Sequence, residues 1–223
     1  TAEIKDYFKA LASPEPMVAN TAESKIRYDL DMVFKPVTLI ENQKVCDDIV
    51  LLTFAEDFQI KPGEFVFLWV PGVCDKPLQL VAINVGEFTE ALMGLEPGQE
   101  TYLRGPYGQS VVPSARQKVI AVAGGTGLAA VYQIARDNPG SEVFTGARTA
   151  ERLYYLNECR NIASVHVATD DGTAGFSGRV TELLEAYLKT LPSAELEDLV
   201  FYNCGPEPMV HAAVAVQTRY AQP

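Results

Sequence analysis

The second half of the chain alternates short apolar runs with longer stretches of helical periodicity. The strand-like runs are Lys118–Ala123, Glu142–Gly146, Ser164–Thr169 and Leu199–Asn203. The helical patterns are Leu128–Asp137, Ala150–Cys159, Arg179–Leu191 and Pro206–Tyr220. Strands that alternate with helices of this length predict βαβ units and a parallel sheet. We therefore expect an α/β domain whose ligands lie beyond the carboxyl ends of its strands.

The first half of the chain has a different pattern, in which strand-like runs are separated by Pro-Gly turns. These runs are Val45–Phe54, Glu64–Val70 and Leu78–Ile83, and a short helix is expected from Thr89 to Leu95. Closely spaced strands of this kind predict a small antiparallel barrel or sandwich. The period changes near Pro113–Arg116. We therefore predict an N-terminal arm (1–33), a barrel (34–112) and an α/β domain (113–223).

Glycines mark the most informative turn of the chain. Gly124-Gly-Thr-Gly127 ends a strand-like run and begins a helical one. Such a turn exposes backbone N–H groups at the positive end of a helix, which suits a pyrophosphate. The spacing departs from Gly-x-Gly-x-x-Gly, so a tight strand–helix connection is the alternative. The turns after the other strands contain Gly146–Arg148, Asp170–Gly172 and Cys204–Met209, and together they predict a nucleotide site at one edge of the sheet.

Charge and composition exclude several classes of partner. The net charge of −11 argues against binding to nucleic acid or to an anionic membrane. No run approaches 18 apolar residues and no signal-peptide pattern opens the chain, which predicts a cytoplasmic location. The four cysteines are scattered without the spacing of a metal or cluster site, so we expect no metal.

Several motifs follow one another in an order that is typical of one family. They are Lys61-Pro-Gly-Glu-Phe65, Lys76-Pro77, Gly86-Glu-Phe-Thr89, Arg104-Gly-Pro-Tyr-Gly108, Gly124-Gly-Thr-Gly127 and Cys204-Gly-Pro-Glu-Pro-Met209. From about residue 34 to 218 the chain resembles ferredoxin–NADP reductase-like flavoproteins, in particular dihydroorotate dehydrogenase electron-transfer subunits and the gamma subunits of soluble hydrogenases. The resemblance implies an FAD-binding antiparallel β-barrel followed by an NAD(P)H-binding α/β domain.

The resemblance assigns a flavin site to the first half of the chain. It implies that Lys76 contacts the flavin diphosphate and that the backbone from Leu78 to Leu80 borders the isoalloxazine ring. The candidates are Lys76, Pro77, Leu78, Gln79, Leu80, Gly86 and Thr89. Gln79 is also a catalytic candidate: it replaces the family's small hydroxyl residue near flavin N5, and its amide can donate a hydrogen bond. For Gly86 and Thr89, an ordinary helix N-cap is the alternative.

The resemblance also assigns the dinucleotide site and a second catalytic candidate, Cys204, whose thiol would help to position the nicotinamide. The binding candidates are Gly124, Gly125, Thr126, Gly127, Arg148, Asp171, Gly205, Pro206 and Glu207. Inert packing is the alternative for Cys204. Arg148 would meet a 2′-phosphate and favour NADPH, or it would pair with Glu151 or face solvent, whereas the family resemblance leans toward NADH.

The function implied is that of an electron-transfer subunit. It would use FAD and NAD(P)H and exchange electrons with the iron–sulfur centres of a partner subunit. The family's cysteine-rich tail would begin about where this sequence stops, at Pro223, so either the tail has been lost or the sequence was cut short. With no cluster ligands in the sequence itself, we expect the partner to carry the clusters. The alternative is a non-catalytic structural subunit that has lost the flavin, which the bulk of Gln79 favours. A third possibility is a free-standing reductase for a soluble acceptor. The given sequence lacks the aromatic C-terminal residue that such enzymes often stack on the flavin.

Overall fold

The computed structural model describes residues 34–56, 59–72, 75–78, 81–83, 86–114 and 117–220. For 75–78 and 81–83 it describes the backbone. The predicted N-terminal arm (1–33) and two site candidates, Gln79 and Leu80, lie outside the described residues.

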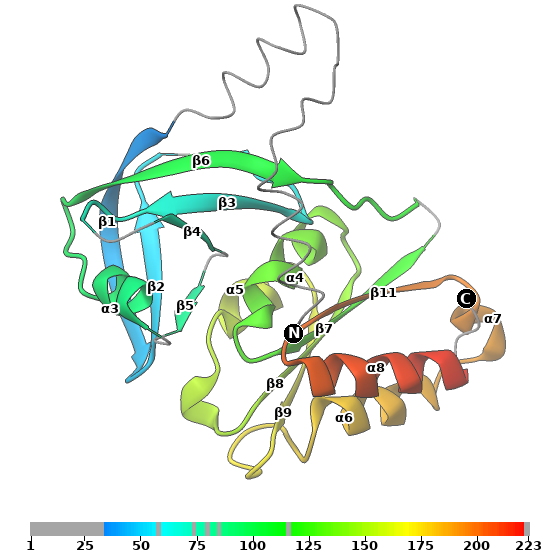
Figure 1. Cartoon of the computed structure of the whole chain (residues 1–223). Coiled ribbons are helices and arrows are strands. Elements are labelled where there is room, and N and C mark those ends of the chain that lie inside the picture. Colours follow the sequence, from blue (N-terminus) through cyan, green and yellow to red (C-terminus); the bar gives the residue numbers. More distant parts are fainter. Residues whose placement is uncertain are drawn as a thin grey trace, which may run out of the picture. The chain divides into compact units, whose positions relative to one another are not determined.

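The first part of the described chain forms an antiparallel sheet with one helix (Figure 1). Its elements are β1 (Lys35–Cys46), β2 (Ile49–Phe54), β3 (Glu64–Trp69), β4 (Asp75–Leu78), β5 (Val81–Ile83), α3 (Glu87–Met93) and β6 (Glu100–Gly108). The described strands lie in the order β4-β3-β6-β1-β2-β5. Every pairing in this sheet is antiparallel.

Alternation along β3 explains how this sheet forms its core. Val66 and Leu68 are buried, and they pack with Phe88 and Leu92 of α3. Phe65 and Phe67 belong to the opposite face, because successive side chains of a strand point to opposite sides. The apolar face of a short helix thus covers the inner face of the sheet.

Three expectations about this half were wrong in detail. Val45–Phe54 is not one strand, because the chain turns at Asp47 and Asp48 and pairs β1 with β2 as a hairpin. Most of β1 escaped prediction because its middle, Glu41-Asn-Gln-Lys44, is polar. Leu78–Ile83 is likewise divided between β4 and β5. Gly105-Pro106, expected as a turn, lies inside β6, where pairing with β3 is irregular between Phe65 and Phe67.

The second part forms a parallel sheet with helices on both faces. Its elements are β7 (Lys118–Gly124), α4 (Gly127–Asp137), β8 (Glu142–Ala147), the 3-10 helix η1 (Ala150–Arg152), α5 (Leu156–Arg160), β9 (Ser164–Thr169), β10 (Phe176–Ser177), α6 (Val180–Leu188), α7 (Ser193–Leu196), β11 (Leu199–Cys204) and α8 (Glu207–Tyr220). The described strands have the order β10-β9-β8-β7-β11, and every pair is parallel.

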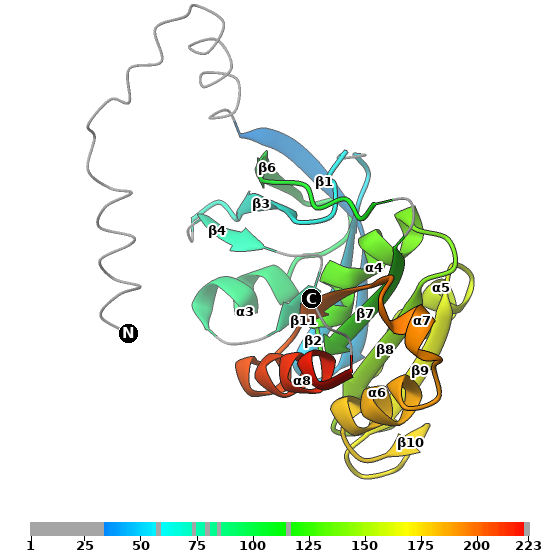
Figure 2. The same cartoon turned by 90° about the vertical axis from the view of Figure 1, so that its right-hand side faces the viewer.

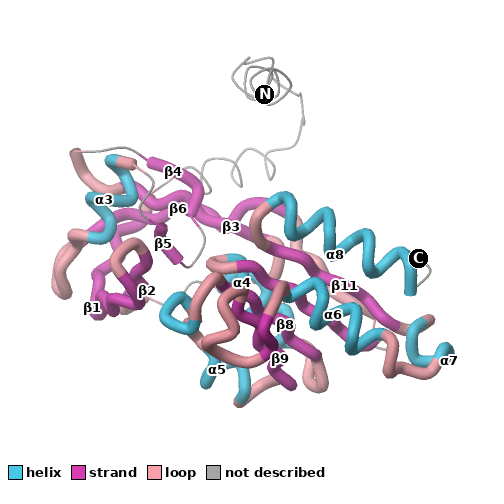
Figure 3. The backbone as a smooth tube through the Cα atoms, turned by 90° about the horizontal axis from the view of Figure 1, so that it is seen from below, coloured by secondary structure: helices cyan, strands magenta, loops and turns pink. Residues whose placement is uncertain are grey.

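The central strand β7 shows why the layers form. Ala121 and Ala123 pack into a core with α4 and α5, whereas Ile120 and Val122 pack into another with α6 and α8. Figure 2 shows α4 and α6 on opposite sides of the sheet, and Figure 3 shows α6 and α8 side by side. Because β7 is buried on both faces, its sequence is a continuous apolar run. The predicted fold class, an antiparallel barrel followed by a parallel α/β domain, is confirmed.

One predicted helix of this half is interrupted. Ala150–Cys159 is split into η1 and α5, and between them Tyr155 adopts a left-handed conformation with φ 56°. The break turns Tyr154 into the core, where 6% of it is exposed. The short elements α7 and β10 were not predicted. In the part of the chain that the structure describes, no helix has the length and apolarity needed to span a membrane.

The barrel and the α/β part share a core. Ile49 of β2 packs in the same buried cluster as Leu128 of α4 and Tyr154. Arg152 donates two hydrogen bonds to the carboxylate of Asp48, at 3.0 and 2.8 Å. The loop between β6 and β7 contains the boundary that we predicted between residues 112 and 113, and that boundary stays a prediction.

Candidate functional site

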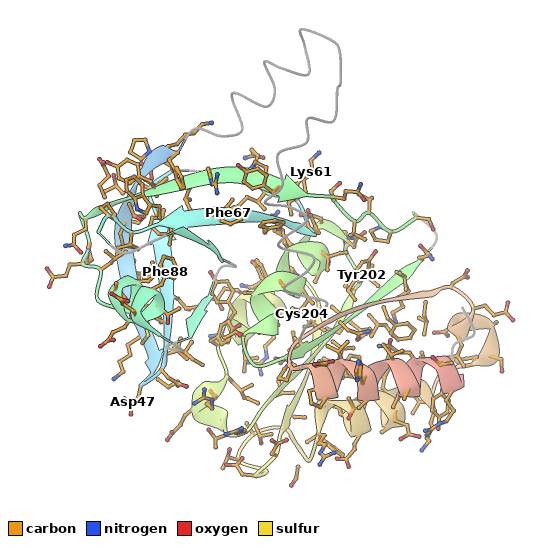
Figure 4. The ribbon with its side chains drawn as sticks, in the orientation of Figure 1. Asp47, Lys61, Phe67, Phe88, Tyr202 and Cys204 are labelled. Carbon is orange, nitrogen blue, oxygen red and sulfur yellow. The ribbon has the colours of Figure 1, made fainter. Side chains whose placement is uncertain are left out.

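The order of the parallel strands produces a switch point. The chain moves from β7 to β8 and β9 on one side, and β11 then lies on the other side of β7. In open α/β sheets, ligands bind in the crevice beyond the carboxyl ends at such a point. Here these ends carry Gly124 on β7 and Cys204 on β11, with Cys204 opposite Ala123. Figure 4 labels Cys204 at the end of β11.

Three glycines allow the two turns at the switch point to touch. A Cβ on Gly127 would lie 2.1 Å from the carbonyl oxygen of Cys204, and one on Gly205 would lie 2.9 Å from the nitrogen of Gly124. A Cβ on Gly124 would lie 2.6 Å from the Sδ of Met209. These glycines are therefore required for packing of the protein against itself.

Gly125 differs from Gly124, Gly127 and Gly205. A Cβ built on it meets nothing within 4 Å, and its φ is +55°. Its own N–H donates to the carbonyl of Gly146 at 2.8 Å, which anchors the turn to β8. The open space at Gly125 is where a ligand can approach the backbone.

The first turn of the 11-residue helix α4 supplies donors beside this space. Leu128 donates to Gly125 and Ala129 donates to Thr126, at 3.3 and 3.2 Å. Among the described residues, none accepts a hydrogen bond from the backbone N–H groups of Thr126 and Gly127. Unsatisfied N–H groups at the positive end of a helix form an anion-binding site.

Tyr154 lies directly against this turn, and the sequence analysis missed it. Its hydroxyl donates to the carbonyl oxygen of Gly125 at 3.4 Å. Burial raises the pKa of Tyr154 far above its ordinary value. A backbone hydrogen bond from Ala129 lowers this pKa, but its effect is smaller than that of burial. The hydroxyl therefore remains protonated and able to donate. The sequence signal was weak, because Tyr154 lies in the middle of a pattern that we interpreted as one helix.

Cys204 and the segment after it complete the carboxyl edge. Cys204 is half-buried, and burial raises the pKa of its thiol, so the group is uncharged near neutral pH. Pro206 and Glu207 are exposed, and Glu207 begins α8. Its carboxylate lies 4.0 Å from the ring nitrogen Nε2 of His211. An uncharged thiol at this edge can contact a ligand without repelling its negative charge.

Arg148 and Asp171 lie at the ends of the next two strands. Arg148 is exposed directly after β8, and among the described ion pairs none joins it to Glu151. Asp171 accepts hydrogen bonds from the backbone N–H and the hydroxyl of Thr173, at 3.0 and 2.6 Å, and these bonds lower the pKa of its carboxyl group. Asp171 therefore holds its own loop together, whereas Arg148 presents an exposed cation at the edge.

The described residues predicted to bind the flavin lie in two parts of the barrel, on β4 and at the start of α3. Lys76, Pro77 and Leu78 lie on β4, an edge strand paired with β3, where a proline is tolerated. Gly86 precedes α3, and the hydroxyl of Thr89 accepts from its N–H at 3.1 Å and donates to its carbonyl at 2.9 Å. Gly86 and Thr89 thus form the N-cap of a seven-residue helix. Gly86 itself is exposed, with nothing within 4 Å of its Cβ position.

Comparison with the sequences of known proteins identifies the family of this chain. Residues 121–215 match the family model of the oxidoreductase NAD-binding domain. A Methanocaldococcus jannaschii protein named as a probable dihydroorotate dehydrogenase B (NAD(+)) electron transfer subunit is 36% identical over 201 residues, which are 85% of this chain and 76% of that protein. The chain belongs to this family of electron transfer subunits. A Thermococcus kodakarensis protein of the same name is 33% identical, over 82% of this chain and 80% of that protein.

Solved structures agree with the fold of the electron transfer subunit family. An NADH-dependent reduced ferredoxin–NADP oxidoreductase, studied for flavin-based electron bifurcation, aligns with a TM-score of 0.72. It is 21% identical to this chain, and the match covers 82% of this chain and 72% of that one. The resemblance inferred from the order of the motifs is therefore confirmed. The individual site residues stay predictions.

The structure brings together one part of the predicted site. The glycine turn and Cys204-Gly205 are in contact, and Pro206 approaches Gly124. Arg148 and Asp171 belong to the same edge, because the N–H of Asp171 donates to the carbonyl of Arg148 at 3.2 Å. Among the described residues, no group of three or more His, Cys, Asp or Glu side chains could hold a metal ion.

Proposed function

We propose that this chain is an NAD(P)H-linked FAD oxidoreductase module. It exchanges electrons between a nicotinamide cofactor and the iron–sulfur centres of a partner subunit. The observation that carries the proposal is the open space at Gly125, which lies beside the N-terminus of α4. The cofactors predicted from the sequence, FAD and NAD(P)H, are confirmed at the level of the family.

The α/β residues fit a dinucleotide diphosphate. The open side of Gly125 admits a phosphate that a side chain would block, and the N–H groups of Thr126 and Gly127 can donate to its oxygens. Cys204 lies at the neighbouring strand end, so its uncharged thiol can contact the nicotinamide end of the same ligand. The protein's contribution is to hold and orient the ligand and to exclude water.

The barrel is proposed to hold the flavin. Bound FAD would accept a hydride and release its two electrons one at a time. Lys76 would balance the charge of the flavin diphosphate, and the exposed turn at Gly86 would border it. Gln79 would donate its amide N–H near flavin N5. These assignments rest on the order of the motifs and on the family.

Absorption spectroscopy tests the flavin proposal. The purified chain is incubated with FAD, freed of excess cofactor, and its visible spectrum is recorded before and after anaerobic addition of NADH or NADPH. Retained flavin that is bleached by one of these cofactors supports the proposal. A chain that takes up no flavin, yet still assembles with its partner, supports the structural-subunit alternative.

A matched pair of glycine variants tests the dinucleotide loop. Gly125→Val should raise the dissociation constant of the dinucleotide at least about tenfold, because loss of one charge-assisted contact corresponds to roughly that factor. Gly140→Val is the control, since Gly140 also has a positive φ and open space but lies in the turn between α4 and β8. Equal affinity in both variants would remove the loop from the site.

Arg148 bears on the choice between NADH and NADPH. Its exposed side chain follows β8, and in related sheets a nearby arginine receives a 2′-phosphate. The two relatives are named for NAD(+). Comparing kcat/KM for both cofactors in the parent and in Arg148→Ala decides the question, because only a 2′-phosphate contact makes the variant lose activity selectively with NADPH.

The partner is tested by purification from the native source. Mass spectrometry of whatever accompanies the chain should identify a subunit with iron–sulfur clusters. A chain that reduces a soluble acceptor at full rate without any partner would contradict this part of the proposal.

A further inference from the structure

Among the hydrogen bonds of the described residues, Tyr154 makes the only one from a side-chain hydroxyl to the open glycine of the turn. It donates to the carbonyl oxygen of Gly125 at 3.4 Å, and this oxygen also accepts from the N–H of Leu128 at 3.3 Å. Both bonds act on the peptide unit that joins Gly125 to Thr126. That unit lies between the open space and the first turn of α4.

The ring of Tyr154 cannot move away from this position. It is buried in a cluster with Leu128 and Ala129 of α4 and with Ile49 of the barrel. Its ring also lies 6.0 Å from that of Tyr155, in an edge-to-face arrangement.

Peptide geometry links this hydroxyl to the ligand. In a trans peptide the C=O and the following N–H point in opposite directions. A carbonyl of Gly125 that is held toward the core therefore directs the N–H of Thr126 away from it. A glycine has many accessible conformations, so without such a contact this peptide is free to rotate.

From this arrangement we propose that Tyr154 is a positioning residue for the dinucleotide. By holding the carbonyl of Gly125 inward, its hydroxyl keeps the N–H of Thr126 directed at a phosphate oxygen of the ligand. The inference rests on the proposed function of the same site. Tyr154 itself contacts the loop and acts through it.

The test compares two tyrosines that differ in one hydrogen bond. Tyr154→Phe removes the hydroxyl and keeps the ring. Tyr155→Phe is the control, because no described residue hydrogen-bonds to the hydroxyl of Tyr155 and its ring packs on the same cluster. Dissociation constants for NADH and NADPH are measured by direct titration of the purified chain, together with the flavin content and the melting temperature.

We expect Tyr154→Phe to weaken dinucleotide binding about fivefold, the factor that corresponds to one ordinary hydrogen bond, and Tyr155→Phe to leave binding unchanged. Flavin content should be the same in both. In addition, amide hydrogen exchange of the peptide that covers residues 124–128 should accelerate in Tyr154→Phe alone, with or without ligand. A merely structural role for Tyr154 would change the melting temperature without changing affinity.

Two outcomes overturn the inference, and they differ from failure of the proposed function. If the parent binds the dinucleotide and Tyr154→Phe binds it equally well, the positioning role is wrong and the proposed function stands. If exchange in residues 124–128 is unchanged, the hydroxyl does not hold the turn. A parent that binds neither NADH nor NADPH refutes the proposed function and the inference together.

Discussion

The two ends of the parallel sheet are organised by different chemistry. At the carboxyl end, backbone atoms and glycines meet, and a buried tyrosine hydroxyl donates to a carbonyl. Toward the amino end, polar side chains meet: Lys118 lies 3.0 Å from Glu142, which lies 2.8 Å from the ring of His166. There another tyrosine, Tyr187, receives a hydrogen bond from Lys118 at 3.2 Å.

The difference separates an end with satisfied side chains from an end with unsatisfied backbone donors. Side chains satisfy one another at the amino end, and the ring of His166 stacks on that of Phe144 at 4.4 Å. At the carboxyl end, the N–H groups of Thr126 and Gly127 have no acceptor among the described residues. An end with satisfied groups contributes to stability, whereas an end with unsatisfied donors is available for a ligand.

The largest effect should come from filling the contact between the two turns. Gly127→Ala should lower the free energy of unfolding by about 3 kcal/mol, because its Cβ would meet the backbone of Cys204, which cannot move cheaply. Gly125→Ala is the control, with a cost of about 1 kcal/mol from its positive φ alone. Urea denaturation measures both. Similar losses in the two variants would contradict the division between packing and ligand-facing glycines.

An intermediate effect is expected at the amino end. Glu142→Gln should lower the free energy of unfolding by about 1.5 kcal/mol, because Lys118 and His166 lose a charged partner that is 13% exposed. The dissociation constant of the dinucleotide should not change. Asp137→Asn, which breaks an exposed pair with Arg136, is the control and should cost much less. A weaker affinity in Glu142→Gln would show that the two ends are not independent.

The smallest effect concerns the link between the barrel and the carboxyl edge. Hydrogen bonds from Arg152, and then from Cys46, lower the pKa of Asp48 to about 2. Asp48→Asn should cost about 0.5 kcal/mol at neutral pH, because solvent screens a pair in which Asp48 is 40% exposed. Since the folded pKa is below the ordinary value of 3.8, this contribution is present above pH 4 and disappears as pH falls toward 2.

Denaturation of the Asp48→Asn variant and the parent across this pH range checks the prediction. Asp47→Asn is the matched control, because Asp47 is fully exposed and pairs with Lys44 in the same hairpin. It should produce no measurable change. A difference between Asp48→Asn and the parent that persists unchanged at pH 2 would show that the carboxylate is not the source of the effect.

The local sequence pattern predicted more of the elements in the α/β half than in the barrel. The run Lys118–Ala123 predicted a strand of a parallel sheet, and the glycines after it predicted the turn. In the barrel, the polar middle of β1 concealed a 12-residue strand, because one face of an antiparallel strand can be solvated. The interruption at Tyr154 and Tyr155 was also hidden, since helical periodicity continues through it.

By itself, the sequence determined the alternation of strands and helices, the glycine turn at residues 124–127, the family and the order of its motifs. These features depend on neighbours along the chain, through periodicity and backbone freedom. The tertiary structure decided which glycine faces open space and which three pack, because β11 returns beside β7 and brings Cys204 and Gly205 against the turn. It also placed Tyr154 under Gly125, 29 residues away, by packing its ring against α4 and the barrel. Contacts between distant segments depend on how whole elements pack, and no local pattern contains that information.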